Sequence, residues 1–387
     1  MAIFQREKQT VPTKEILAAL ARGDEIDLSH CKIEEPVDIN RYFDEPFSTL
    51  KEQLNLQQED TTITITFNQK ITFNSCTFED DVVFAPPWSQ IGTIKVIFNS
   101  DVYFNSSKII GQARFTGCQF NSHAGFDGCA FKSVACFRHV CFCQASMMRT
   151  AEFEGYGLFS NTTFKGHAKF SSTFFRKGVN LTNVKFLSYT DFAGVYAGSK
   201  TVPVYDGIFF AKKCYGDDET FWRFIKQCAQ ESGHYQMAGE NFYQERCAHF
   251  WLKLRGTDYE HLSIFKKSLR QIYGLRLLPE FAFGRILFGY GERPIRALLS
   301  SAMVILFCAV IYSNNGSQII FRGEPAGTEK FIDYLYFSVT TFATLGLGDV
   351  YPTDNSFIRF VVMSEVLAGA VLMSLFVVSL AKRFSRS

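Results

Sequence analysis

Large apolar residues recur every eleven positions through the middle of the chain, in two interleaved series that never slip. The first series is Phe98, Ile109, Phe120, Phe131, Phe142, Phe153, Phe164, Phe175 and Phe186. The second is Phe104, Phe115, Phe126, Phe137, Met148, Phe159, Phe170, Leu181 and Phe192. Together they space apolar residues alternately five and six apart, which fits neither the period of a helix nor that of a strand. The spacing predicts short strands separated by corners, each with one large side chain pointing inward.

Small residues stand two positions before many of these large residues, which leaves room for stacked rings: Ala113, Ala124, Cys129, Ala135, Ala151 and Ala168. Gly, Asn and Ser nearby suit the corners. The pattern resembles the phenylalanine-rich class of pentapeptide-repeat proteins. The resemblance implies a right-handed parallel β-solenoid with four short faces per coil over residues 60–198, after an N-terminal cap region at 1–59.

Residues 199–292 are predicted to form a helical linker between the solenoid and the membrane. Within it, 217–255 reads as two helices interrupted around Ser232 and Gly233. A basic amphipathic stretch, 262–278, follows and ends just before a proline. Such a stretch favours a helix that lies on the inner membrane surface.

Two long apolar runs, Ile295–Ser313 and Phe357–Ala381, predict membrane spans within a pore domain at 293–387. Residues 253–296 hold nine Lys/Arg against four acids, and the tail after the second span adds three bases. The segment between the spans, 314–356, holds two bases against five acids. Because positive charge stays on the cytoplasmic side, both termini are expected in the cytoplasm.

The loop between the spans is not polar, as a simple external hairpin would be. Residues 331–347 are aromatic and too short to span, which predicts a re-entrant pore helix at 331–343. Non-helical backbone at membrane depth survives only when it is buried in protein or lines water. From Thr344 to Asp349 the sequence alternates side chains with glycines, which take backbone angles that other residues resist. The alternation predicts that successive carbonyls point the same way, as cation coordination requires.

These residues resemble the pore module of two-helix potassium channels, whose pattern T-x-x-T-x-G-x-G-D with a following proline appears as Thr341, Thr344, Gly346, Gly348, Asp349 and Pro352. The resemblance covers about 295–385. It implies that the backbone oxygens of Thr344, Leu345, Gly346 and Leu347 bind potassium, with the Thr344 hydroxyl as the innermost ligand. Since one loop supplies a quarter of such a filter, a homotetramer is expected.

Several positions depart from the family pattern. The commonest filter has Val and Tyr at the positions of Leu345 and Leu347, although a leucine at the second position is similar to the second pore loop of two-pore-domain potassium channels. The usual pore-helix tryptophans are replaced by Tyr336 and Phe337, which predicts a filter braced mainly by packing. Thr340 occupies the site where the family often has Glu, so no Glu–Asp pair is expected behind the filter.

The second span contains two gating candidates. Gly369 matches the position where family inner helices often carry a hinge glycine. Glu365 is ionisable within a span, which marks a functional hypothesis. It has two interpretations: it hydrogen-bonds to the pore helix, or it lines the pore. Residues 289–291 read Gly-Tyr-Gly but lack upstream threonines, so we interpret them as a turn rather than a filter.

Composition narrows the remaining classes of function. The chain carries a formal charge of +2, and residues 61–198 hold twelve Lys/Arg against eight acids, a net of +4. This balance argues against DNA mimicry and against a nucleic-acid partner. The eleven cysteines lack metal-ligand spacing, apart from the weak C-x-C of Cys141 and Cys143, and are expected to be reduced and buried. No catalytic or nucleotide-binding signature stands out, so no enzyme activity and no cofactor are expected.

The sequence therefore predicts a passive potassium channel in the lipid bilayer of the inner (plasma) membrane. The solenoid would be a rigid scaffold, or a sensor of an unidentified cytoplasmic ligand or protein. Two alternatives stay open. One is a weakly selective cation channel, which Leu347 motivates, and the other is a membrane-anchored scaffold protein with a silent pore.

Overall fold

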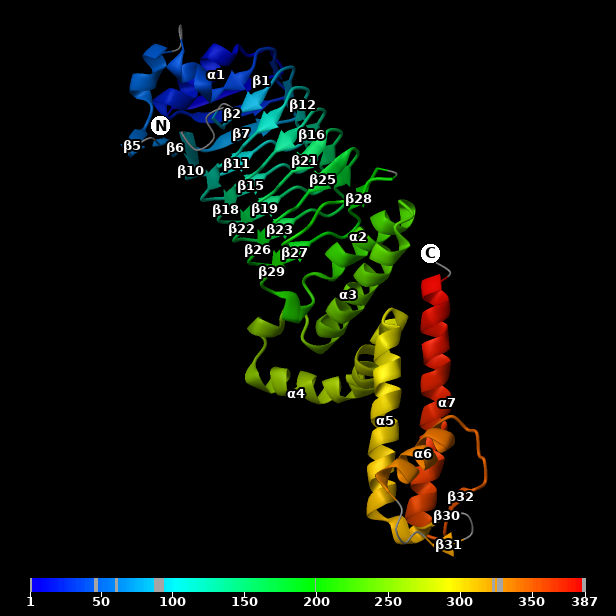
Figure 1. The fold of residues 1–387 in the computed structure, drawn as a ribbon. Coiled ribbons are helices and arrows are strands. Elements are labelled where there is room, and N and C mark those ends of the chain that lie inside the picture. The colour runs from blue at the N-terminus through cyan, green and yellow to red at the C-terminus, as the bar shows by residue number, and fades with distance from the viewer. Residues whose placement is uncertain are drawn as a thin grey trace. The chain divides into compact units, whose positions relative to one another are not determined.

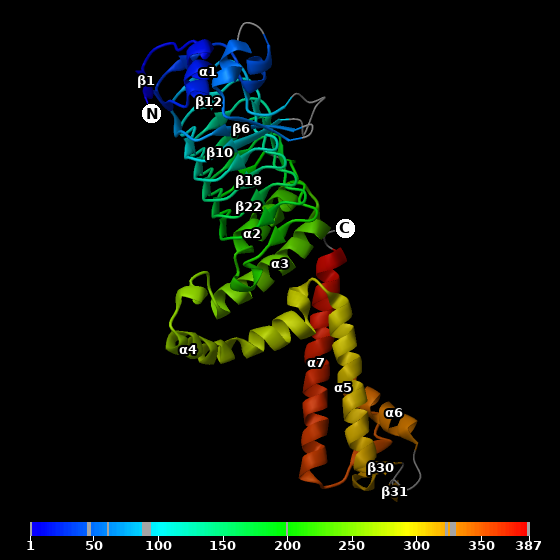
Figure 2. The same cartoon turned by 90° about the vertical axis from the view of Figure 1, so that its left-hand side faces the viewer.

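The computed structural model describes residues 2–44, 48–59, 62–86, 94–198, 200–321, 324–325 and 330–384. The chain divides into two compact units, 1–271 and 272–387, which are described separately. Figures 1 and 2 show stacked coils of short strands in the first unit and long helices in the second.

Four sheets form the faces of the solenoid in the described residues. One contains β1 (Ile3–Glu7), β2 (Glu25–Ser29), β7 (Ile71–Asn74), β11 (Val102–Tyr103), β15 (Ala124–Gly125), β19 (Ser146–Met147), β23 (Ala168–Lys169) and β27 (Thr190–Asp191). The next contains β5 (Leu56–Glu59), β6 (Thr62–Phe67), β10 (Ile94–Phe98), β14 (Gln119–Phe120), β18 (Cys141–Phe142), β22 (Thr163–Phe164), β26 (Lys185–Phe186) and β29 (Phe209–Phe210).

The third sheet contains β3 (Lys32–Ile33), β8 (Thr77–Phe78), β12 (Lys108–Ile109), β16 (Ala130–Phe131), β20 (Glu152–Phe153), β24 (Phe174–Phe175) and β28 (Tyr196–Ala197). The fourth contains β4 (Val37–Asp38), β9 (Val82–Val83), β13 (Ala113–Arg114), β17 (Ala135–Cys136), β21 (Tyr156–Leu158) and β25 (Gly178–Asn180). Apart from β5 on β6, the pairs in these sheets are parallel, so the predicted solenoid with four faces is confirmed.

One coil contains two of the eleven-residue repeats. Phe98 pairs with Phe120 and Phe120 with Phe142, so the register advances by 22 residues per coil. A corner with left-handed backbone recurs every eleven residues, at Ser106, Gly117, Gly128, His139, Thr150, Asn161, Ser172, Asn183 and Gly194. Each of these corners lies two residues after a member of the second apolar series, which is why that series does not slip.

Stacked phenylalanines fill the interior. Phe98, Phe120 and Phe142 stack at centroid distances of 4.8 and 5.1 Å, with planes within 12° of parallel. Offset rings at this separation add attraction beyond the burial of their area. Small residues that stand two positions before members of the second series, such as Ala113 and Ala135, are buried and leave the room that the sequence predicts.

Parallel pairing also extends upstream of residue 60, because β2, β3 and β4 pair with β7, β8 and β9. Helix α1 (Thr13–Arg22) and the 3₁₀ helices at Ile39–Phe43 and Ser48–Gln53 accompany this first coil. The domain boundaries named above stay predictions.

Two helices, α2 (Glu219–Glu231) and α3 (Tyr235–Leu254), follow the last coil and break at the expected place. Phe221 of α2 packs on the ring of Phe192 at 5.2 Å, so the aromatic core continues into this helix. Helix α4 (Ile264–Gly274) occupies most of the amphipathic stretch, and helical backbone continues through its predicted end as far as Leu287. Short helical segments at Lys213–Tyr215, Tyr259–His261, Leu275–Leu277 and Glu280–Leu287 complete the linker.

The second unit contains the long helices α5 (Pro294–Asn314) and α7 (Ser356–Phe384), with α6 (Phe331–Phe342) between them in sequence. Both long helices are apolar and long enough to cross a membrane, which agrees with the two predicted spans. The segments between the two long helices pair as β30 (Ile319–Phe321), β31 (Glu324–Pro325) and β32 (Val350–Pro352), after a 3₁₀ turn at Gly316–Gln318. Gly289–Gly291 is a 3₁₀ turn, as predicted.

Candidate ion-conduction site

Helix α6 begins and ends at local signals in the sequence. At its start the Lys330 backbone N–H donates to the Asp333 carboxylate at 2.9 Å, a capping interaction. At its end the N–H groups of Thr344 and Leu345 turn back to the carbonyls of Thr341 and Thr340, at 3.0 and 2.9 Å. The Thr340 and Thr341 side chains are largely buried, and the chain leaves the helix directly into the predicted filter.

The filter loop alternates its backbone conformation. Thr344, Gly346 and Gly348 have positive φ angles of 55°, 52° and 78°, and the residues between them do not. A threonine rarely adopts this region, and such outliers concentrate at functional sites. In an ordinary strand, successive carbonyls point to opposite sides. Alternation of the sign of φ removes this difference, which is the backbone geometry that brings successive carbonyls to one side.

The residues of the predicted filter are uncovered within the single chain. Leu345 and Leu347 are each 62% exposed, although both are large and apolar. In the part of the chain that the structure describes, the carbonyls of residues 344–347 accept no hydrogen bond. Because these residues are exposed, their carbonyls are open to water, ions or other chains.

A side-chain hydrogen bond braces the loop from the pore helix. The Tyr336 hydroxyl donates to the Asp349 carboxylate at 3.0 Å. The sequence analysis expected a filter braced mainly by packing, because the family tryptophans are missing. The tyrosine supplies a polar brace that this expectation left out. Phe337, by contrast, is buried and packs on the Tyr312 ring at 4.9 Å.

Glu365 joins helices α5, α6 and α7. Its carboxyl accepts a hydrogen bond from the Tyr312 hydroxyl of α5 at 2.6 Å and contacts the Ser338 hydroxyl of α6. Its side chain lies in the protein, since the residue is 1% exposed. Of the two interpretations offered for Glu365, this geometry matches the one in which it hydrogen-bonds to the pore helix.

Gly369 lies one helical turn further along the same face of α7. A Cβ at this position would stand 2.1 Å from the carbonyl oxygen of Phe342, the last residue of α6. Residues four apart share a face of a helix, and Ser338 and Phe342 are also four apart. The Glu365–Gly369 face of α7 therefore contacts the Ser338–Phe342 face of the pore helix. The missing side chain of Gly369 allows this close approach.

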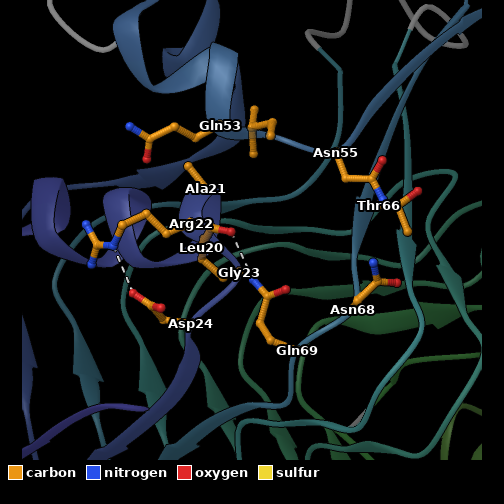
Figure 3. A pocket seen from close by; sticks show the side chains of 11 residues that line it. Leu20, Ala21, Arg22, Gly23, Asp24, Gln53, Asn55, Thr66, Asn68 and Gln69 are labelled. Carbon is orange, nitrogen blue, oxygen red and sulfur yellow. Dashed lines mark hydrogen bonds and ion pairs between the residues drawn. The ribbon is translucent and has the colours of Figure 1, made fainter. Parts of the chain in front are cut away.

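Other candidate sites offer less chemistry. A cavity of about 330 Å³ lies beside the end of α1, where Arg22 pairs with Asp24 and the Gln69 amide donates to the Leu20 carbonyl (Figure 3). The remaining lining side chains are the amides of Gln53, Asn55 and Asn68, together with Ala21, Leu54 and Thr66. The Cys141 and Cys143 sulfurs lie 3.8 Å apart. These two cysteines and Cys214 are only partly buried, so the expectation that cysteines are buried fails for these three. Among the described residues no group of three or more metal-ligating side chains occurs.

The sequence analysis missed two members of this site, Tyr312 and Ser338. Each is a polar residue in an apolar helix, and that was the available signal. Their partner Glu365 lies 53 and 27 positions away, so spacing alone does not pair them.

Comparison with known proteins assigns the second unit. Residues 299–386 match the family model described as ion channel. No curated protein and no solved structure matches the chain. With the two apolar helices, the family match identifies the C-terminal part of the chain as a two-span ion channel domain, and the protein as a membrane protein that also carries a parallel β-solenoid.

Proposed function

We propose that the protein is a passive, potassium-selective channel that works as a homotetramer. The filter is Thr344 to Asp349, and the backbone oxygens of Thr344, Leu345, Gly346 and Leu347 bind dehydrated potassium ions. Conduction follows the electrochemical gradient and needs no cofactor beyond the permeating ion.

The observation that carries this proposal is the unpartnered, alternating backbone at residues 344–348. Positive φ angles at every second residue, free carbonyls and exposed leucines are difficult to explain in a chain that acts alone. Four copies around one axis supply the missing cover, and ions supply the missing partners of the carbonyls. Such an arrangement accounts for all three features together.

The charge asymmetry around the spans supports an inner (plasma) membrane protein with both termini in the cytoplasm. The bases that precede the first span and the acids of the outer loop carry this argument. The three bases of the C-terminal tail support the same orientation, but they do so only through the sequence, because their side chains are not described. The solenoid is then a cytoplasmic scaffold. Regulation by an unidentified ligand or protein remains compatible with this arrangement.

The test is flux through purified protein in liposomes that hold a potassium gradient. Wild type should pass potassium, and Gly346→Val should abolish flux, because the substitution strains a positive-φ position in the filter. Gly233→Val is the matched control. Gly233 also has a positive φ and open space around an added Cβ, but it lies between α2 and α3.

Reversal potentials in mixed potassium and sodium separate the rivals. A potential that follows potassium supports the proposal, and one that follows both ions indicates the weakly selective channel. If wild type forms tetramers that carry no flux even after removal of the solenoid, the silent scaffold replaces the proposal.

A further inference from the structure

The carboxyl of Glu365 has polar neighbours but no cation. From α5 it is faced by the Tyr312 hydroxyl and the Cys308 thiol, and from α6 by the Ser338 hydroxyl. On α7 itself, the basic residue nearest in sequence is Arg359, which bonds to Thr353 and Asp354. Among the described residues no lysine or arginine forms an ion pair with Glu365.

The polar neighbours of Glu365 lie within an apolar cluster. Cys308 and Tyr312 belong to one buried cluster with Phe337, Ile358 and Val361. A carboxylate without a cation is strongly disfavoured in such surroundings, because it loses its hydration and gains no opposite charge. A neutral carboxylic acid avoids that loss and can both donate and accept a hydrogen bond.

The hydrogen-bond geometry has a place for the extra proton. The Ser338 oxygen lies 2.8 Å from the Ile305 carbonyl of α5 and also contacts the first carboxyl oxygen of Glu365. A serine hydroxyl has one hydrogen and cannot donate to both. If Glu365 donates its proton to the Ser338 oxygen, Ser338 donates to Ile305, and Tyr312 donates to the second carboxyl oxygen. Every hydrogen then has one acceptor.

We propose that Glu365 is a positioning residue of the filter that works as a neutral carboxylic acid. Its proton joins α7 to Ser338 of the pore helix, Ser338 passes the connection to α5, and Tyr312 closes the ring. The pore helix is thereby held to both spans, with Gly369 as the second contact on the same face. The proton is permanent, so Glu365 acts as a structural hydrogen-bond donor rather than as a pH sensor.

Infrared spectroscopy of the full-length protein in lipid tests the protonation without any conduction. The difference spectrum of wild type against Glu365→Gln should contain the carbonyl stretch of a carboxylic acid, which shifts in heavy water. Recording at about pH 9 removes the contribution of Asp217, whose pKa is raised to about 7 by burial. Asp217→Asn is the control, and it should leave this band unchanged. A difference spectrum that contains only carboxylate bands overturns the proposal.

Flux measurements test the positioning role and rest on the proposed channel function. Glu365→Gln keeps a neutral donor of similar shape and should retain flux and selectivity. Glu365→Val and Ser338→Ala should each reduce flux about tenfold or shift the reversal potential, because the pore helix loses polar contacts. The positioning role is overturned if valine performs like glutamine. If wild type itself does not conduct, the channel function fails, while the infrared result still decides the protonation.

Discussion

In the solenoid, each coil satisfies the backbone of the next, whereas the pore unit leaves its most important backbone unsatisfied. Strands such as β14 and β18 pair in register, and their phenylalanines stack in a buried interior. In the pore unit, Leu345 and Leu347 stand exposed beside carbonyls that accept no hydrogen bond in the described part of the chain. The solenoid is complete within one chain, whereas under the proposed function the pore unit is completed by lipid, further copies and ions.

This difference predicts whether a mutation in each region should reduce stability or function. Close-packed interiors respond to the loss of a single ring with a loss of stability. A site whose partners come from outside the chain responds with a loss of function and little change in the stability of the chain. The predictions below test this division, beginning with the largest expected effect.

Phe137→Ala should destabilise the solenoid by about 3–5 kcal/mol. Phe137 stacks on Phe115 and Phe159 at 5.2 and 5.1 Å and meets Phe126 edge-on, so its removal leaves a cavity between coils. Urea denaturation of the full chain in detergent, followed by circular dichroism, measures the change in the free energy of unfolding. Phe209→Ala is the control, because Phe209 is 51% exposed and its loss should be nearly neutral. Equal effects of the two substitutions would contradict the division.

The end of the solenoid should contribute a pH dependence of stability through one buried carboxyl. Burial raises the pKa of Asp217 from 3.8 to about 7, although Thr190 donates to the carboxyl through its backbone N–H and its hydroxyl. Because the folded state holds the proton more tightly, the free energy of unfolding falls as the pH rises from about 4 to about 7. The difference in pKa corresponds to at most about 4 kcal/mol, and stability is flat with respect to this group above pH 7.

Asp217→Asn should remove most of this dependence and stabilise the protein at about pH 8, since an amide can keep both contacts with Thr190. Denaturation curves at about pH 5 and pH 8 measure it, with the exposed Asp354→Asn as control. Burial also raises the pKa of the neighbouring Asp218, so a residual slope is expected. A variant as pH-dependent as wild type would show that Asp217 is ionised in the fold.

Gly369→Ala should displace the pore helix at a cost of about 1–3 kcal/mol, because the new Cβ meets the Phe342 carbonyl. The expected result is a change in the reversal potential, since the filter follows α6. The hinge interpretation instead predicts a change in opening with unchanged selectivity. The double variant Ala368→Gly, Gly369→Ala restores a glycine to this turn of α7 but keeps the new Cβ. It therefore separates the hinge interpretation from the close-contact interpretation. Rescue by the double variant favours a hinge, and no rescue favours the close contact.

The sequence predicted features that repeat or lie next to one another along the chain, and it did not predict contacts between distant side chains. The solenoid was predictable because one corner every eleven residues imposes a period on Phe104, Phe115 and Phe126 that is visible along the chain. The filter pattern was visible because its residues are contiguous. The bond from Tyr336 to Asp349 and the ring around Glu365 were not predicted, because they join helices through side-chain geometry that has no period.

The smallest effect should come from the brace behind the filter. Tyr336→Phe removes one exposed hydrogen bond to Asp349, worth about 1 kcal/mol, so the protein should fold normally but lose flux faster over time. Asp349→Asn weakens the same bond from its other end, and the double variant completes a cycle. If the bond braces the filter, the double variant should decay no faster than either single one. Additive effects would mean that the two residues act separately. The pore would then depend on packing for its rigidity, as the solenoid does.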